Sequence, residues 1–269
     1  MGFLDLMTTD FLSFVVPAYL AMALFMVLLW AVQLTIKNAS VGDVGFCFGL
    51  IAVVVWYATQ LSGEPQRKWL VGLMVCCYAG RLGSYILFNR VIGKPEDPRY
   101  RLLRQQWGRW ESIAVFGYFH LQALAVAAFS LPFLVLIRNP LPPFGIWELL
   151  GFLLWIAAIS GEALADWQLA RFRSDPSTRD RVCREGLWYY SRHPNYFFEW
   201  LHWWAYVVMA FGVPGWPLAW IGPVAMGWAL LKVTGIPLAE EQAVKNRGEE
   251  YRDYQRTTNK FFPWRPGSA

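Results

Sequence analysis

The stretch LSFVVPAYLAMALFMVLLWAVQLTI, residues 12–36, decides the fold class of this chain. A bilayer core about 30 Å thick is crossed by about 20 mostly apolar helical residues, and this stretch is long enough to cross it. It is too long for the apolar part of a signal peptide, and Asp5 and Asp10 precede it where such a peptide carries positive charge. We therefore predict that these residues form a membrane-spanning helix.

The same criterion selects further apolar stretches along the chain, which gives seven predicted transmembrane helices in all. Composition agrees with this, because 56% of the residues are hydrophobic and only 16% are charged, whereas soluble domains carry about 25% charged residues. We predict an all-α integral membrane protein in which residues 1–269 form a single membrane domain with a tail at 237–269. The predicted spans are about 12–36, 44–62, 69–89, 112–137, 144–170, 195–212 and 216–236.

The positions of the basic residues predict the topology, since cytoplasmic loops are enriched in Lys and Arg. Alternating the loops places Lys37 and the basic segments 90–111, 171–194 and 237–269 on one side. The amino terminus is then outside and the tail is cytoplasmic, which requires an odd number of spans. We expect the protein to lie in the bacterial cytoplasmic membrane. The opposite side holds Arg67, Lys68 and Arg138, and Arg81 and Lys232 lie within predicted spans.

Charge and cysteine usage exclude two other classes of function. A net charge of +5 would suggest nucleic-acid binding in a soluble chain, but in a membrane chain its distribution between loops matters more than its sum. The cysteines, Cys47, Cys76, Cys77 and Cys183, form no CxxC pair and show no zinc spacing. We expect a lipid membrane as the surroundings, and neither a nucleic-acid partner nor a metal.

Polar residues recur at helical spacing within the third predicted span. Tyr78, Arg81, Tyr85 and Asn89 lie at offsets 0, 3, 7 and 11, so they share one face that we expect to point inward. A tyrosine in this pattern is as often a packed aromatic as a functional group. Arg81 lies too far from the membrane surface to reach it comfortably, so it needs an anionic or carbonyl partner within the bundle.

Two further clusters occur in the later part of the chain. Glu162, Asp166 and Arg173 share a stripe of the fifth predicted span, as either a functional site or an internal ion-pair network. In GLWYYSRHPNYFFEW, residues 186–200, the proline suits the first turn of a helix, whose free amides would form an anion site. His193 and Arg192 lie at the start of this helix, and Asn195 and Glu199 face the same way at an i, i+4 spacing.

The tail and the clusters together suggest a nucleotide site. The tail contains the stretch GIPLAEEQAVKNRGEEYRDYQRTTNKFFPW, residues 235–264. Its acidic residues are as consistent with a solvated amphipathic helix on the surface as with a functional site. Arginines and carboxylates beside an apolar interior suit a cofactor that carries phosphates, together with an apolar substrate from the bilayer. Because the sequence contains neither GxGxxG after a strand nor GxxxxGK[ST], we expect helices to bind this cofactor.

From about Gln60 to Pro263 the chain resembles the steroid 5α-reductase family of membrane oxidoreductases, as a bacterial member. The matching motifs are YxxRxxxYxxxNR at Tyr78–Arg90, ExxxDxxxxxxR at Glu162–Arg173, RHPNYFxE at Arg192–Glu199 and YxxYxxxTxxFxP at Tyr251–Pro263. The resemblance implies seven helices that hold NADPH at their cytoplasmic end. It also implies hydride transfer to the carbon–carbon double bond of a conjugated ketone, such as a 3-oxo-Δ4-steroid or a similar apolar enone that enters from the bilayer.

The resemblance also implies roles for individual residues. Tyr78 matches the tyrosine that hydrogen-bonds the ketone, and Gln60 stands where mammalian members have a glutamate; both would stabilise the enolate as catalytic donors. Phe198 departs from the family, because bacterial relatives usually have Gly there. The implied cofactor-binding residues, with the neighbouring arginines and the histidine that complete the set, are Arg81, Arg90, Arg101, Arg104, Glu162, Asp166, Arg173, His193, Asn195, Tyr196, Glu199 and Tyr254.

Two other classes of function remain open. RHPNYxxE followed by EExxxxxxxGxxYxxY and a terminal FxP also resembles membrane methyltransferases that use S-adenosylmethionine on isoprenylcysteine or phospholipid headgroups. Those enzymes share little with Tyr78–Arg90, and their cofactor has no phosphate to occupy so many arginines. A transporter or a lipid-binding scaffold is the third class, but the sequence shows no matching halves with helices broken by Gly or Pro.

Overall fold

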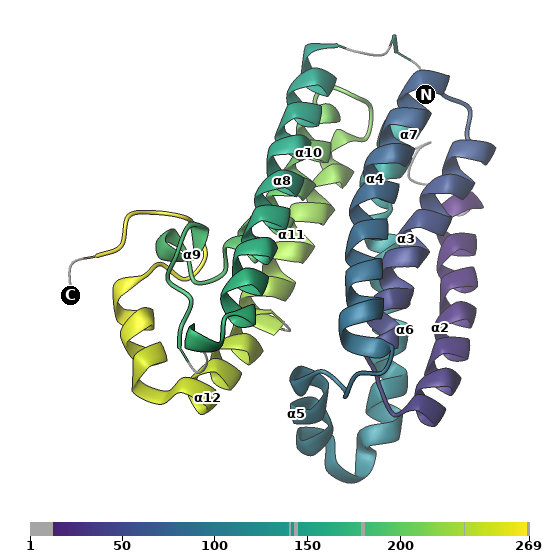
Figure 1. Ribbon diagram of the computed structural model, residues 1–269. Helices are drawn as coiled ribbons and strands as arrows, with labels where there is room; N and C mark the ends of the chain where they lie inside the picture. The colour runs from purple at the N-terminus through teal and green to yellow at the C-terminus, as the bar shows by residue number, and fades with distance from the viewer. Residues whose placement is uncertain (1–12, 140, 143–144, 179–180, 234, 268–269) are drawn as a thin grey trace. The chain divides into compact units, whose positions relative to one another are not determined.

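The computed structural model describes residues 13–139, 141–142, 145–178, 181–233 and 235–267, and every regular element among them is a helix (Figure 1). Residues 12 and 144, at which two predicted spans begin, and the end of the predicted tail, 268–269, lie outside the described residues. The α-helices are α2 Val16–Ile36, α3 Val41–Gln60, α4 Pro65–Ile86, α5 Pro98–Trp107, α6 Glu111–Phe129, α7 Leu131–Arg138, α8 Ile146–Ser174, α9 Leu187–Tyr190, α10 Pro194–Met209, α11 Ile221–Trp228 and α12 Ile236–Thr257. Short 3-10 segments are η3 Gly108–Trp110, η4 Pro176–Thr178 and η5 Trp216–Trp220, and π segments are η2 Leu87–Val91 and η6 Ala229–Val233.

These helices group into two compact units, and each is described by itself. The first unit comprises Met1–Leu149 and Tyr206–Gly222, and the second comprises Leu150–Ala205 and Pro223–Ala269. Helices α8, α10 and α11 contribute residues to both units, because the division falls within them.

In the first unit, α2, α3, α4, α6 and α7 pack as a bundle, and the short helix α5 contacts α6 (Figure 1). Glycines of α3 allow α2 to approach closely, as small residues do at helix crossings in membranes. A Cβ atom at Gly45 would lie 2.2 Å from Leu29, and one at Gly49 would lie 2.3 Å from Met22. The helix α5 begins where Asp97 accepts a hydrogen bond from the Arg99 backbone N–H at 2.9 Å and Pro98 occupies the first turn.

In the second unit, tryptophan side chains join α8, α9, α10 and α11. The indole N–H of Trp188 in α9 donates to the carbonyl oxygen of Ala165 in α8 at 2.9 Å. The indole N–H of Trp200 in α10 donates to the carbonyl oxygen of Pro223 in α11 at 3.0 Å. Each of these indoles, buried at Trp188 and half-buried at Trp200, therefore satisfies its polar atom at a helix contact. Helix α12 carries the chain to its C-terminal segment.

Six helical segments among the described residues are long and apolar enough to cross a membrane, which supports an integral membrane protein. The remaining predicted span, 195–212, coincides with α10, which has 16 residues and measures about 24 Å at 1.5 Å per residue. That length falls short of a bilayer core about 30 Å thick, so the seventh span and the topology stay predictions. The six segments are Ser13–Ile36, Val41–Gln60, Pro65–Val91, Pro98–Arg138, Ile146–Ser174 and Trp216–Thr257.

Two of the predicted spans are interrupted. The span 112–137 divides between α6 and α7 at Ser130, because Pro132 has no N–H to continue the hydrogen-bond ladder. The span 216–236 consists of η5, α11 and η6 in succession, with prolines at 217 and 223 in its first half. Periodicity identified these apolar segments but could not locate the changes of helix type inside them.

Candidate functional site

The second unit contains a group of polar side chains around the turn between α9 and α10. We call it the RHPN cluster, and it consists of Asp166, Arg192, His193, Asn195 and Glu240. The chain is extended at Ser191, with φ −145° and ψ 146°, and the next helix begins at Pro194. Proline at this first position fixes the entry into α10, so the residues before it are presented at the helix start.

Arg192 is buried and uses its guanidinium inside the protein. Its Nε donates to Glu240 Oε1 at 2.7 Å, and its Nη1 donates to the carbonyl oxygens of Gln255 at 2.9 Å and Thr258 at 2.6 Å. Its backbone N–H donates to the carbonyl oxygen of Asn259 at 2.8 Å. Arg192 therefore joins the RHPN turn to α12 and to the segment after it.

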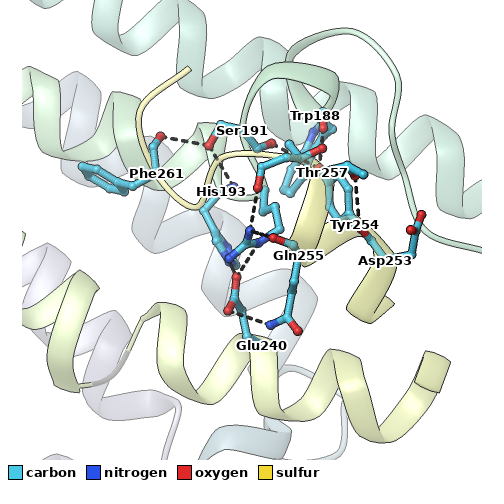
Figure 2. Close-up of polar contacts among 11 residues, drawn as sticks. Trp188, Ser191, His193, Glu240, Asp253, Tyr254, Gln255, Thr257 and Phe261 are labelled. Carbon is cyan, nitrogen blue, oxygen red and sulfur yellow. Dashed lines mark hydrogen bonds and ion pairs between the residues drawn. The ribbon is translucent and has the colours of Figure 1, made fainter. Parts of the chain in front are cut away.

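Glu240 is the common acceptor of this cluster. Besides Arg192, it accepts from Gln255 Nε2 at 2.9 Å, and His193 Nε2 lies 3.2 Å from its Oε1; Figure 2 shows His193 and Gln255 converging on it. The positive end of α10 was expected to attract an anion. The structure places one of the chain's own carboxylates beside that helix start, so Glu240 supplies negative charge there.

Tyr254 and Ser191 hold the C-terminal segment in place. The hydroxyl of Tyr254, a buried residue, donates toward the carbonyl oxygens of Trp188 and Ser191 (Figure 2). Ser191 Oγ donates to the carbonyl oxygen of Phe261 at 2.9 Å. Tyr254 therefore has a structural role in joining α12 to the α9–α10 turn, and its implied cofactor contact stays a prediction.

The predicted carboxylates of α8 meet α10 in the same unit. Asn195 Nδ2 donates to Asp166 Oδ1 at 3.2 Å. Glu162, one turn before Asp166, is buried, whereas Arg173 near the end of α8 is exposed. The imidazole of His193 stacks on the ring of Tyr196, with centroids 5.5 Å apart and planes inclined by 7°.

Phe198 packs directly on α8. A Cβ atom at Gly161 would lie 2.4 Å from the Phe198 ring, so the aromatic side chain occupies space that exists only because residue 161 is glycine. The ring therefore fills the α8–α10 contact beside Glu162. This explains how the chain accommodates phenylalanine where relatives that it resembles have glycine.

Burial determines the protonation of His193. Desolvation lowers the pKa of its imidazole below the ordinary value of 6.5, although the neighbouring Glu240 acts in the opposite direction. Arg192 and Lys260 add to the lowering. His193 is consequently neutral at physiological pH and contacts Glu240 as an uncharged imidazole.

In the first unit the two predicted catalytic residues lie apart. Tyr78 is buried in the middle of α4, whereas Gln60 is the exposed last residue of α3 and its Nε2 contacts only Thr59 among the described residues. Near Tyr78, Cβ atoms at Gly80 and Gly83 of α4 would approach Ile51 and Cys47 of α3. Because Gly80 lies beside Ile51 and Gly83 beside Cys47, Gln60 lies about 10 Å from the level of Tyr78 along the helix axis, at 1.5 Å per residue. The shared role of Tyr78 and Gln60 as donors to one ketone oxygen stays a prediction.

The polar face of α4 is only partly buried. Arg81 is half-buried, in agreement with its predicted position inside the bundle, but Tyr85 and Asn89 are exposed. Asn89 lies in the π segment η2, whose wider turn changes the direction of the side chains after Ile86, whereas Tyr85 lies in the last turn of α4. Arg90 in that segment makes an ion pair with Asp97 at 3.2 Å.

Arg104 belongs to an ion-pair group that holds α5. Its Nε donates to Glu96 at 2.9 Å, its Nη1 to Glu111, and its Nη2 to Gln33 at 3.0 Å. All three arms of this guanidinium are thus engaged by the chain, whereas Arg101 is exposed. Beside it, burial raises the pKa of Asp97, but Arg99 and Arg90 outweigh this and lower it overall, so the ion pair forms at neutral pH.

The sequence analysis did not identify the pairing of Arg192 with Glu240 and Gln255, although it placed Arg192 at the start of the helix and included Glu240 in the acidic part of the tail. Their contacts span 48 and 63 positions of the chain, so no local pattern connects them. The acidic pair at 240–241 and the arginine before HPN were visible. Only their opposite charges in largely apolar surroundings could have suggested that they pair.

The donor set of the second unit is suited to a nucleotide. Carboxylates at 162 and 166 and the Asn195 amide offer partners for ribose hydroxyls, and the exposed Arg173 offers one for phosphate. Arg192, by contrast, is satisfied internally and does not contribute. Among the described residues, no three His, Cys, Asp or Glu side chains are grouped so that they could hold a metal ion.

Among the comparisons with known proteins, one family model covers most of the chain. A family described as a protein of unknown function (DUF1295) matches residues 29–258 of the chain. No curated protein and no solved structure matches it significantly.

Proposed function

The chain belongs to the DUF1295 family, and from this membership we propose that it is an NADPH-dependent membrane oxidoreductase similar to the steroid 5α-reductases. Its reaction would be the reduction of the carbon–carbon double bond of a conjugated ketone, a 3-oxo-Δ4-steroid or a similar apolar enone from the bilayer. The family is associated with steroid 5α-reductase-like membrane proteins, and six apolar helices are consistent with an apolar substrate.

The observation that carries the proposal is the hydrogen bond between Asn195 and Asp166. It joins α8 and α10 at 3.2 Å and brings together two motifs, ExxxD and RHPN, that the resemblance assigns to one cofactor site. Glu162 lies one turn away, and the His193–Tyr196 stack lies at the start of the same α10. These residues would bind and orient the cofactor, which when bound supplies a hydride for the β carbon of the enone.

Tyr78 is the residue to which we assign polarisation of the substrate. As a buried phenol in α4, it can donate a hydrogen bond to a ketone oxygen that gains negative charge as hydride arrives. Gln60, the last residue of α3, is the second donor that the resemblance implies, and this role stays a prediction. Protonation of the α carbon then completes the reduction.

A second candidate function is an S-adenosylmethionine-dependent methyltransferase of isoprenylcysteine or phospholipid type. The Arg192–Glu240 ion pair favours it, because it joins the RHPNY motif to the EE motif, the two segments that resemble such enzymes. The hydrogen bond between Asn195 and Asp166 favours the reductase, because it joins the two motifs that the resemblance assigns to the NADPH site.

Thermal unfolding of the detergent-purified protein with NADPH, NADH or S-adenosylmethionine separates the two candidates, because a ligand bound by the folded state alone raises the midpoint. We expect NADPH to raise it more than NADH, and S-adenosylmethionine to leave it unchanged. Stabilisation by S-adenosylmethionine alone would refute the reductase. Asp166→Asn, which keeps the size of the side chain, should reduce the NADPH shift, whereas the surface variant Arg252→Gln should keep it.

A further inference from the structure

An exposed group of aromatic and basic side chains lies on the second unit, next to the RHPN cluster. We call it the aromatic–basic surface. Two chain segments form it, one at the end of α9 and one after α12. Its aromatic members are unusually exposed for their type: Tyr189 is 50% exposed, Tyr190 43%, Phe262 59% and Trp264 74%. Its basic members are Lys260 and Arg265.

Hydrogen bonds hold the two segments of this surface together. The backbone N–H of Trp264 donates to the carbonyl oxygen of Tyr190 at 3.1 Å. Asn259 Nδ2 donates to the carbonyl oxygen of Trp264 at 3.0 Å. The buried neighbour Phe261 is fixed by Ser191. These hydrogen bonds therefore hold the backbone that carries the exposed aromatic rings in a defined conformation.

The neighbouring tryptophan relates this surface to a predicted span. Trp188, next to Tyr189, is buried and its indole N–H donates to the carbonyl oxygen of Ala165. Ala165 lies inside the candidate span Ile146–Ser174, about 14 Å before its end at 1.5 Å per residue. Tyr189 and Tyr190 thus lie beside the last turns of that span, where aromatic side chains of membrane proteins meet the headgroup layer.

The charges of the surface are of one sign. In the described part of the chain, no ion pair engages the side chains of Lys260 or Arg265. The basic residues of α12 differ, because Lys245 pairs with Glu241 at 2.7 Å and Arg256 pairs with Glu249 at 2.9 Å. Unpaired cations next to Tyr and Trp are complementary to anionic lipid headgroups.

We propose that the aromatic–basic surface lies in the headgroup layer and binds anionic phospholipids, which hold the C-terminal segment on the bilayer. The same segment carries the carbonyl oxygens of Thr258 and Asn259 that receive Arg192. Bound lipid would therefore also order the residues that close the RHPN cluster. The proposal does not depend on which cofactor the protein uses.

Hydrogen–deuterium exchange of the full-length protein tests this proposal in nanodiscs of phosphatidylcholine alone and of phosphatidylcholine mixed with phosphatidylglycerol. Each basic residue near an anionic surface contributes about fivefold in binding, so with Lys260 and Arg265 together we expect residues 258–267 to exchange about 25-fold more slowly in the anionic discs. The double variant Lys260→Glu, Arg265→Glu should lose this difference. The control Lys245→Glu, Arg252→Glu carries the same charge change on exposed α12 residues and should keep it.

Quenching by phosphatidylcholine brominated near its glycerol end identifies the lipid contact directly. The quenched fraction of the tryptophan emission should be larger for the wild type than for Trp264→Phe. Equal quenching in both proteins, or equal exchange of 258–267 in the two kinds of nanodisc, would overturn the proposal. The proposal would also be overturned if residues 258–267 exchanged as slowly in detergent micelles as in the anionic discs. Lipid would then contribute nothing to the protection of this segment.

Discussion

At the scale of single residues, Arg192 carries its charge into the interior of the second unit, and its neutralisation depends on Glu240. Removing one partner of a buried pair leaves the other uncompensated, at a cost of about 3 kcal/mol. We therefore expect Arg192→Gln and Glu240→Gln to lower the unfolding midpoint in detergent clearly. The exposed Arg252→Gln should change stability by less than about 0.5 kcal/mol.

The same variant decides whether Arg192 contacts the cofactor. Because its donors are engaged by the chain, Arg192→Gln should weaken NADPH and NADH binding by the same factor. A loss confined to NADPH would show that this guanidinium contacts the phosphate that distinguishes the two nucleotides, contrary to the geometry described above.

Tyr78 is expected to affect turnover and not cofactor binding. Removing one preorganised donor from a developing oxyanion costs about 100-fold in rate, so Tyr78→Phe should lower kcat with an enone by about that factor. The NADPH-dependent rise in the unfolding midpoint should stay at its wild-type value. If the rise disappears, Tyr78 belongs to the cofactor site.

His193 makes the stability of the protein depend on pH. Its folded-state pKa lies below the ordinary 6.5, so the unfolded chain binds the proton more readily and stability decreases as the pH falls through 6.5 toward the folded pKa. Above pH 6.5, His193 is neutral in both the folded and the unfolded chain, so the protein loses no stability through it. Between pH 7.5 and 5.5, the unfolding midpoint of the wild type should therefore fall more steeply than that of His193→Gln; parallel curves would show that this imidazole stays neutral for another reason.

At the scale of elements, three glycines share a backbone conformation that other residues avoid. Gly108 has φ 53° and ψ −124°, Gly186 has φ 58° and ψ −125°, and Gly248 has φ 55° and ψ −124°. Gly108 ends α5, Gly186 precedes α9, and Gly248 divides α12 at a kink. Each therefore marks a point at which one helical segment gives way to another.

Replacing one of these glycines should destabilise the protein. Gly186→Ala places a methyl group 2.4 Å from Gln168 and forces alanine into a left-handed conformation, which costs about 1–3 kcal/mol. Gly117→Ala in α6 is the control, since a Cβ atom there meets nothing within 4 Å. Its unfolding midpoint should stay near that of the wild type, while that of Gly186→Ala falls.

The sequence predicted elements better than it predicted their internal contacts. Apolar runs with few charges identified the helices because length and composition are local properties. The contact between Asp166 and Asn195 could be predicted from the sequence, because each residue belongs to a recognisable motif. The Arg192–Glu240 ion pair could not be predicted, because its partners are far apart in the chain. The exposure of Gln60 could not be predicted either, because it depends on where α3 ends.

At the scale of the whole molecule, topology is the property that remains to be measured. The charge distribution predicts an external amino terminus and a cytoplasmic tail, which requires α10 to act as a span although it has 16 residues. A fluorescent-protein fusion at the C-terminus should be bright and an alkaline phosphatase fusion there inactive. The reverse pattern would mean an even number of spans or an inverted orientation.

The Arg192 contacts also have a consequence for synthesis of the chain. The partners of this arginine follow it by 48 positions at Glu240, 63 at Gln255 and 66 at Thr258. At 5–20 residues per second, translation needs about 3–13 seconds to make the last of them. Until these residues have been synthesised, the Arg192 guanidinium of a newly made RHPN turn has none of these partners. A messenger truncated before codon 240 would therefore yield a chain in which this turn cannot form its native contacts.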